Sequence, residues 1–176
     1  MDLKTKLKTR ISKDEIIELI YSLNNNRISI EEIIDLLKNQ ETQFQASWLM
    51  THLVENKPSI LKETHIKQLV KILETTSHEG LERNIWRSLN FVEIPSKIHE
   101  NLINIAFDKL ENHKTAIAIQ VFAMSVLEKV LVNQTELQLA LKAILELKLE
   151  QQPSAGLKSR ALKIIHKINL NHDTAF

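Results

Sequence analysis

Short segments with helical periodicity recur along this chain at a nearly constant spacing. Apolar residues return every three or four positions in nine segments, and none of these segments alternates between apolar and polar residues as a half-buried strand does. The segments span residues 13–24, 29–39, 42–56, 63–75, 79–92, 96–111, 115–132, 135–150 and 154–170. Short connections join them, so each helix is expected to pack antiparallel to the next one. The pattern predicts an all-α fold.

Pairing the helices reveals a repeat. After the first segment the other eight form four pairs, whose second members begin at residues 42, 79, 115 and 154, which are 36 to 39 residues apart. The two tryptophans follow the same spacing: Trp86, in NIWRSLNFVEIP, lies 38 positions after Trp48, in ASWLMTHLVENKP. A single pair cannot cover its own apolar face, so successive pairs stack and bury it between them. We therefore predict an α-α superhelix: a solenoid of about four helix pairs behind an N-terminal capping helix, with the two tryptophans in similar positions of successive repeats.

Helix starts are marked by hydroxyl residues. Ser12 with Glu15 and Ser29 with Glu32 match the capping box, in which each side chain satisfies a free amide near the start of the helix. Weaker versions of this signal, a threonine followed three residues later by Glu or Gln, occur at Thr42, Thr76 and Thr135. For the domain organisation we expect a flexible basic N-terminus over 1–12, a single repeat domain over 13–170 and a loose tail over 171–176.

The alternation of helices resembles HEAT or armadillo-type repeats over nearly the whole chain. More narrowly, three segments resemble a family of short, uncharacterised HEAT-like proteins of the Bacteroidetes group: ASWLMTHLVENK, ENLINIAFDKLENHKTAIAIQVFAMSVL and QQPSAGLKSRALKIIHKI. Relatives sometimes carry the label adenylosuccinate lyase, which this sequence does not support. That lyase is a much larger enzyme with a glycine-containing mobile signature loop, and two lone glycines, Gly80 and Gly156, cannot build such a loop.

Composition argues against most kinds of chemistry. The chain has no cysteine, which excludes thiolate sites. It has only two glycines, too few for the glycine-rich phosphate loops and nucleophile elbows of many enzymes. None of the seven histidines belongs to an H-E-x-x-H pair, so we expect them to be solvated surface residues. We therefore expect no catalytic residues, no metal and no cofactor, and a protein that is not an enzyme.

Charge and hydropathy bear on partners and location. The 23 basic and 22 acidic residues leave a net charge of +1, which argues against nucleic acid or an anionic membrane as the partner. The N-terminal segment lacks the apolar run of a secretory signal, and no stretch approaches the roughly 18 apolar residues of a membrane span. A cytoplasmic protein is expected, either a monomer or a weak homo-oligomer.

The polar faces of the second helices are the candidate binding surface. On a helical wheel these faces lie opposite the apolar arcs and would line the concave groove of a solenoid, the face that such folds commonly use for binding. The candidate partner-binding residues are Trp48, His52, Arg83, Arg87, Asn90 and Lys163. A merely solvated face is the alternative. Packing between repeats is the first interpretation of both tryptophans, and the second is that Trp48 is partly exposed and anchors a partner.

Two functions are compatible with these observations. The first is a non-enzymatic scaffold or adaptor that binds a protein or peptide along the concave face. The second is a nucleic-acid-binding protein or a DNA-repair glycosylase, because HEAT-like glycosylases share the fold that the resemblance implies. That family places an Asp one turn after a Trp, whereas His52 follows Trp48 and Asn90 follows Trp86 at this spacing. The missing carboxylate favours the scaffold.

Overall fold

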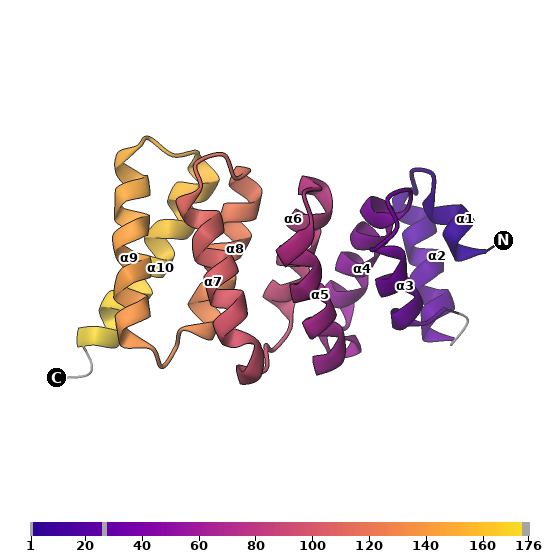
Figure 1. Ribbon diagram of the computed structural model, residues 1–176, viewed down its shortest axis with the longest axis horizontal. Helices are drawn as coiled ribbons and strands as arrows, with labels where there is room; N and C mark the ends of the chain where they lie inside the picture. The colour runs from indigo at the N-terminus through magenta and orange to yellow at the C-terminus, as the bar shows by residue number, and fades with distance from the viewer. Residues whose placement is uncertain (1, 26–27, 174–176) are drawn as a thin grey trace. The chain divides into compact units, whose positions relative to one another are not determined.

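The computed structural model describes residues 2–25 and 28–173 of the chain, and these residues form ten α-helices and two short 3-10 segments (Figure 1). No strand occurs in the described residues. The predicted all-α class is therefore confirmed, and eight of the nine expected helices begin within two residues of their predicted starts. The remaining expected helix, predicted to start at residue 96, begins with a 3-10 turn at Ser96–Ile98 that passes directly into the α-helix.

The chain divides into two compact units, Met1–Pro95 and Ser96–Phe176, where a single repeat domain was expected over 13–170. In the first unit α3 packs on α4 and α5 packs on α6, which are the predicted pairs. The two pairs stack so that first helix meets first helix and second meets second: α3 also contacts α5, and α4 contacts α6. The elements of this unit are α1 (Leu3–Leu7), α2 (Lys13–Asn24), α3 (Ile30–Leu36), α4 (Gln43–Asn56), η1 (Pro58–Ile60), α5 (Glu63–Thr75) and α6 (Glu79–Phe91).

The second unit repeats this scheme. Helix α7 packs on α8 and α9 packs on α10, while the first members α7 and α9 and the second members α8 and α10 also meet. Its elements are η2 (Ser96–Ile98), α7 (His99–Glu111), α8 (Ile117–Val130), α9 (Thr135–Glu150) and α10 (Ala155–Asp173). Each unit thus contains two of the four predicted helix pairs.

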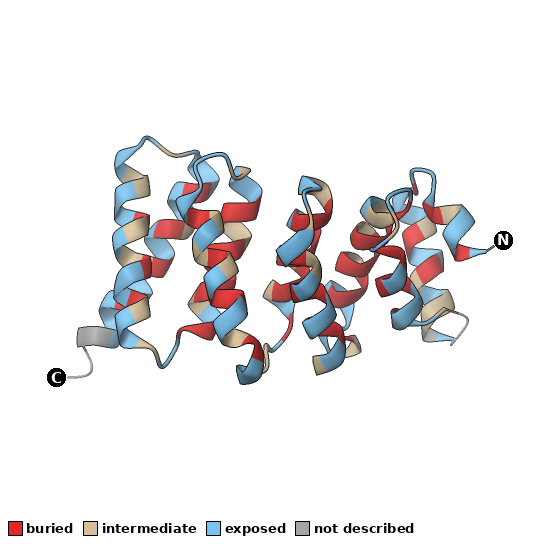
Figure 2. Cartoon of the chain, viewed as in Figure 1, coloured by how far each residue is buried: buried red, intermediate tan, exposed pale blue. Residues whose placement is uncertain are grey.

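Apolar side chains fill the interior of each unit, and the buried positions follow the helix sides that face neighbouring helices (Figure 2). Leu49, Leu69 and Leu89 are fully buried in the first unit, and Leu102 and Leu145 in the second. Each such leucine stabilises the fold by roughly 1.5–3 kcal/mol relative to an exposed one. Within the described residues, none of the helices combines the length and the apolar character needed to cross a bilayer.

The N-terminal segment differs from the expectation of a flexible basic region over 1–12. Residues Leu3–Leu7 form helix α1, and Leu3, Leu7 and Ile11 are buried. The four-residue spacing of Leu3 and Leu7 places both side chains on one face of α1, and Ile11 is buried in the loop that follows, while Lys4 and Lys8 are exposed. At the other end, α10 continues to Asp173 instead of stopping at residue 170, and residues 174–176 of the expected loose tail lie outside the described residues.

Helices start close to both the serine and the threonine signals, but of Ser12, Ser29 and Thr42 only the serines cap their helices through the side chain. Ser12 forms a complete capping box with Glu15, and the hydroxyl of Ser29 accepts a hydrogen bond from the amide of Glu32. The hydroxyl of Thr42 instead turns inward and donates to the carbonyl oxygen of Leu36 at 2.8 Å, where it is fully buried. Before α6, the capping residue is His78, whose Nδ1 accepts from the amide of Leu81.

Among the histidines whose burial the structure describes, His65 is buried, contrary to the expectation that all seven are solvated. The exposed fraction of His65, on α5, is 4%, and its Nδ1 accepts a hydrogen bond from the amide of Lys62. Its Nε2 lies 3.1 Å from Oε1 of Glu31, at the start of α3. The imidazole therefore helps to join the first members of two successive pairs.

Candidate functional site

Five of the six predicted site residues lie on two neighbouring helices of the first unit. Trp48 and His52 are on α4, and Arg83, Arg87 and Asn90 are on α6, which packs directly against α4. The sixth, Lys163, is an exposed residue of α10 in the second unit. We call the region formed by Trp48, His52, Arg83 and Arg87 the α4–α6 surface.

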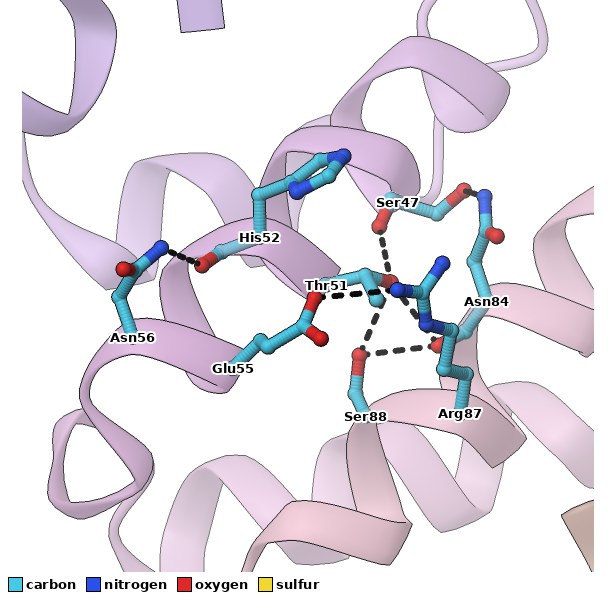
Figure 3. Close-up of polar contacts among 8 residues, drawn as sticks. All are labelled: Ser47, Thr51, His52, Glu55, Asn56, Asn84, Arg87 and Ser88. Carbon is cyan, nitrogen blue, oxygen red and sulfur yellow. Dashed lines mark hydrogen bonds and ion pairs between the residues drawn. The ribbon is translucent and has the colours of Figure 1, made fainter. Parts of the chain in front are cut away.

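A buried seam of small polar side chains holds α4 and α6 together beneath this surface (Figure 3). The amide of Asn84 donates to the hydroxyl of Ser47 at 2.9 Å. The hydroxyl oxygen of Thr51 lies 3.1 Å from that of Ser88 and 3.1 Å from the carbonyl oxygen of Asn84. Small side chains allow two helix backbones to approach closely, and the cross-helix hydrogen bonds satisfy the buried hydroxyl and amide groups. The seam therefore determines how α4 and α6 align.

Sequence reasoning missed this polar seam, although it has a signal. Ser47 and Thr51 are four residues apart on α4, and Asn84 and Ser88 have the same spacing on α6, each 37 positions further on. A four-residue spacing places both members of a pair on one side of a helix. Small polar residues at matched positions of successive repeats could have been recognised as a contact between second helices.

The two tryptophans occupy different environments. Trp86 is fully buried, and its Nε1 donates a hydrogen bond to Oε1 of Glu82 at 3.3 Å. Trp48 is partly exposed, and its ring meets the imidazole of His52 edge to face, with 5.2 Å between the ring centroids. The prediction that both hold similar positions is therefore wrong with respect to burial, because Trp86 is fully buried and Trp48 is not.

Arg87 and Glu55 connect the two helices on the outside of the seam. Nη2 of Arg87 lies 3.0 Å from Oε2 of Glu55, and Figure 3 shows the guanidinium reaching across from α6 to this carboxylate of α4. Both side chains are more than a third exposed, so the pair contributes little to stability. Partial burial lowers the pKa of His52, and the charge of Arg87 lowers it further.

The side chain of Asn90 is hydrogen-bonded to its own helix, α6. Its side-chain amide donates to the carbonyl oxygen of Trp86 at 2.9 Å. Because this bond holds the amide against the helix backbone, Asn90 is less suited than Arg83 to reach a partner. Within the described residues, no group of three His, Asp or Glu side chains is placed to hold a metal ion.

Trp48 and Arg83 line the same hollow. Its volume is about 430 Å³, and its lining residues are Arg10, Ile11, Phe44, Gln45, Trp48 and Arg83. Trp48 and Arg83 are two of the candidates predicted from the sequence, and Arg10 lies in the segment expected to form a basic N-terminus. Sequence reasoning missed Ile11 and Phe44, because these residues meet only where the loop after α1 packs against the start of α4, with the amide of Ile11 donating to Oε1 of Gln45 at 3.4 Å.

The arrangement of helices agrees with a comparison against protein families. The family model described as a HEAT repeat domain matches residues 3–168. The chain belongs to this family. The match includes residues 3–12, in agreement with the packing of α1 into the first unit. Neither a curated protein nor a solved structure matches the chain.

Proposed function

We propose that this HEAT repeat protein is a non-enzymatic scaffold that binds a protein or peptide partner at the α4–α6 surface. The observation that carries the proposal is the shared hollow of Trp48 and Arg83, two residues on different helices of successive pairs. Tryptophan and arginine are the residue types that most often dominate binding energy at protein interfaces. The rigid seam below them supplies a preorganised support, which reduces the ordering cost of binding.

Membership of the HEAT repeat family supports the same proposal. Stacked helix pairs offer an extended surface, and folds of this class commonly use that surface to bind other proteins. The nucleic-acid alternative has less support, because Trp86 is buried and His52 stands one turn after Trp48 where a glycosylase would need a carboxylate. The net charge of +1 also provides little attraction for phosphates.

A capture experiment with matched variants tests the proposal. The tagged wild-type chain is incubated with a lysate of its native host, and bound proteins are identified by mass spectrometry. The double variant Trp48→Ala/Arg83→Ala is expected to lose a stoichiometric partner that the wild type retains, while its circular dichroism is unchanged. Arg87 is left intact, because its removal would leave Glu55 without its cation.

The matched control is Lys71→Ala, a change of an exposed cation on α5 outside the hollow. It is expected to retain the partner. Retention of the same partner by the double variant would contradict the assignment of the site. Salt-sensitive binding of duplex DNA, followed by release of a methylated purine, would instead support the glycosylase function.

A further inference from the structure

The hollow beside Trp48 combines an apolar floor with a positively charged rim. Ile11, Phe44 and Trp48 supply the apolar part, and Phe44 exposes 38% of its surface. With about 430 Å³, the hollow is within the size range of small-ligand sites and has room for one large side chain. An apolar group of a partner would remove these surfaces from water.

The start of helix α6 fixes the position of the Phe44 side chain. A Cβ added to Gly80 would lie 2.7 Å from two carbons of the Phe44 ring, so only glycine leaves room for the ring at this position. The imidazole of His78 also lies against the Phe44 ring, with 5.9 Å between the ring centroids and an interplanar angle of 31°. Phe44 is therefore positioned by the first turn of α6 while its outer face remains open.

Two guanidinium groups at the hollow have no partner among the residues that the structure describes. Arg10 and Arg83 are both exposed, and neither guanidinium group forms a hydrogen bond or an ion pair with any residue that the structure describes. The neighbouring Arg87, by contrast, is paired with Glu55. None of the six described lining residues is acidic, so the charge of both groups is available to a ligand. Guanidinium groups bind carboxylates through paired hydrogen bonds.

We infer that this hollow binds an acidic peptide segment in which carboxylates flank one aromatic or large aliphatic side chain. The apolar side chain lies against Trp48 and Phe44, and the carboxylates pair with Arg10 and Arg83. A phosphate or a nucleic-acid backbone would satisfy the arginines but would leave the apolar floor uncovered. The inference rests on the proposed function, because it names the chemistry of the partner that the scaffold would bind.

Labelled peptides test this inference on the whole chain. The probe is the fluorescein-labelled peptide Asp-Glu-Phe-Glu-Asp, and three matched peptides replace the acids by their amides, the acids by lysines, or the phenylalanine by serine. Fluorescence anisotropy is expected to show saturable binding of the probe that weakens with added salt. Each matched peptide is expected to bind at least about fivefold more weakly, as expected for the loss of one modest contact.

Variants locate the binding. Arg10→Gln and Arg83→Gln are each expected to weaken probe binding about fivefold, and Lys71→Gln is expected to leave it unchanged. Gly80→Ala displaces the Phe44 ring without altering charge and is also expected to weaken binding. Circular dichroism confirms that each variant is folded.

Several results would overturn the inference. These are equal affinity for the amide peptide, unchanged binding by both arginine variants, and preference for a phosphorylated peptide or an oligothymidylate over the probe. Failure of the probe to bind at millimolar concentration would do the same. None of these results contradicts the scaffold function, which is tested separately by loss of the captured partner in Trp48→Ala/Arg83→Ala.

Discussion

Thr51 of α4 and Ser88 of α6 hold their hydroxyl oxygens 3.1 Å apart inside the interface between the two helices. Both residues are fully buried, so water cannot replace a lost hydrogen bond. Thr51→Val keeps the shape of the side chain but removes its hydroxyl, and we expect it to lower the free energy of unfolding by about 1–2 kcal/mol. Urea denaturation measures this change.

A double-mutant cycle measures the interaction energy between Thr51 and Ser88 apart from their other contacts. Thr51→Val combined with Ser88→Ala is expected to cost less than the sum of the two single changes, with a coupling energy of about 0.5–1 kcal/mol. Thr64→Val, at an exposed position of α5, is the control and should change stability by less than about 0.5 kcal/mol. Strict additivity of the two buried changes would show that the hydroxyl pair contributes nothing.

The different burial of the two tryptophans predicts different fluorescence. In Trp48→Phe the remaining emission comes from the fully buried Trp86, and we expect it to be blue-shifted and resistant to quenching by iodide. In Trp86→Phe the remaining emission comes from the partly exposed Trp48, and we expect it to be red-shifted and quenched more strongly. Equal quenching constants in the two folded variants would contradict the structure.

The two glycines predict opposite responses to alanine. Gly156, in the first turn of α10, has open space where a Cβ would be placed, so Gly156→Ala is expected to stabilise the protein by about 0.5–1 kcal/mol. Gly80→Ala places its Cβ 2.7 Å from the ring of Phe44, so its gain in helix propensity is reduced or reversed. Chemical denaturation of both variants measures the difference, and equal gains would mean that Phe44 moves without cost.

The imidazole of His52 predicts a pH dependence. Burial lowers its pKa below the ordinary value of 6.5, Arg87 and Lys13 lower it further, and Glu55 acts in the opposite direction. The folded state therefore binds this proton less readily than the unfolded state does. The contribution of His52 to stability is complete above pH 6.5 and is lost as the pH falls through its folded-state pKa.

Arg87→Gln is expected to raise the pKa of His52 towards its ordinary value, because it removes a cation and frees the carboxylate of Glu55. An NMR titration of the imidazole Cε1 proton measures this shift. Lys71→Gln, on α5, should leave the titration unchanged. An unaltered midpoint in Arg87→Gln would contradict the proximity of the two side chains.

Local signals in the sequence account for most of the helices. The starts at Ser12 and Ser29 were correct because hydroxyl and amide partners only three residues apart need no distant contact. Helix α6 starts at Glu79 as predicted, but its capping side chain is His78, whose Nδ1 accepts from the amide of Leu81, while the hydroxyl of Thr76 accepts from the amide of His78. Helix α1 was missed because five residues are too few to form a helix without packing, and the burial of Leu3 and Leu7 supplies that packing.

The amino-acid sequence by itself determined that this protein is all-α, that its helices form four pairs, and that it belongs among HEAT-like repeats, because periodicity and repeat spacing are local properties of the chain. Only the tertiary structure decided that Trp86 is buried while Trp48 borders a hollow, and that Arg10 and Arg83 meet there. These relationships depend on the distance between side chains of different helices. A shift of one residue in how α4 and α6 align would change them while leaving the periodic pattern intact.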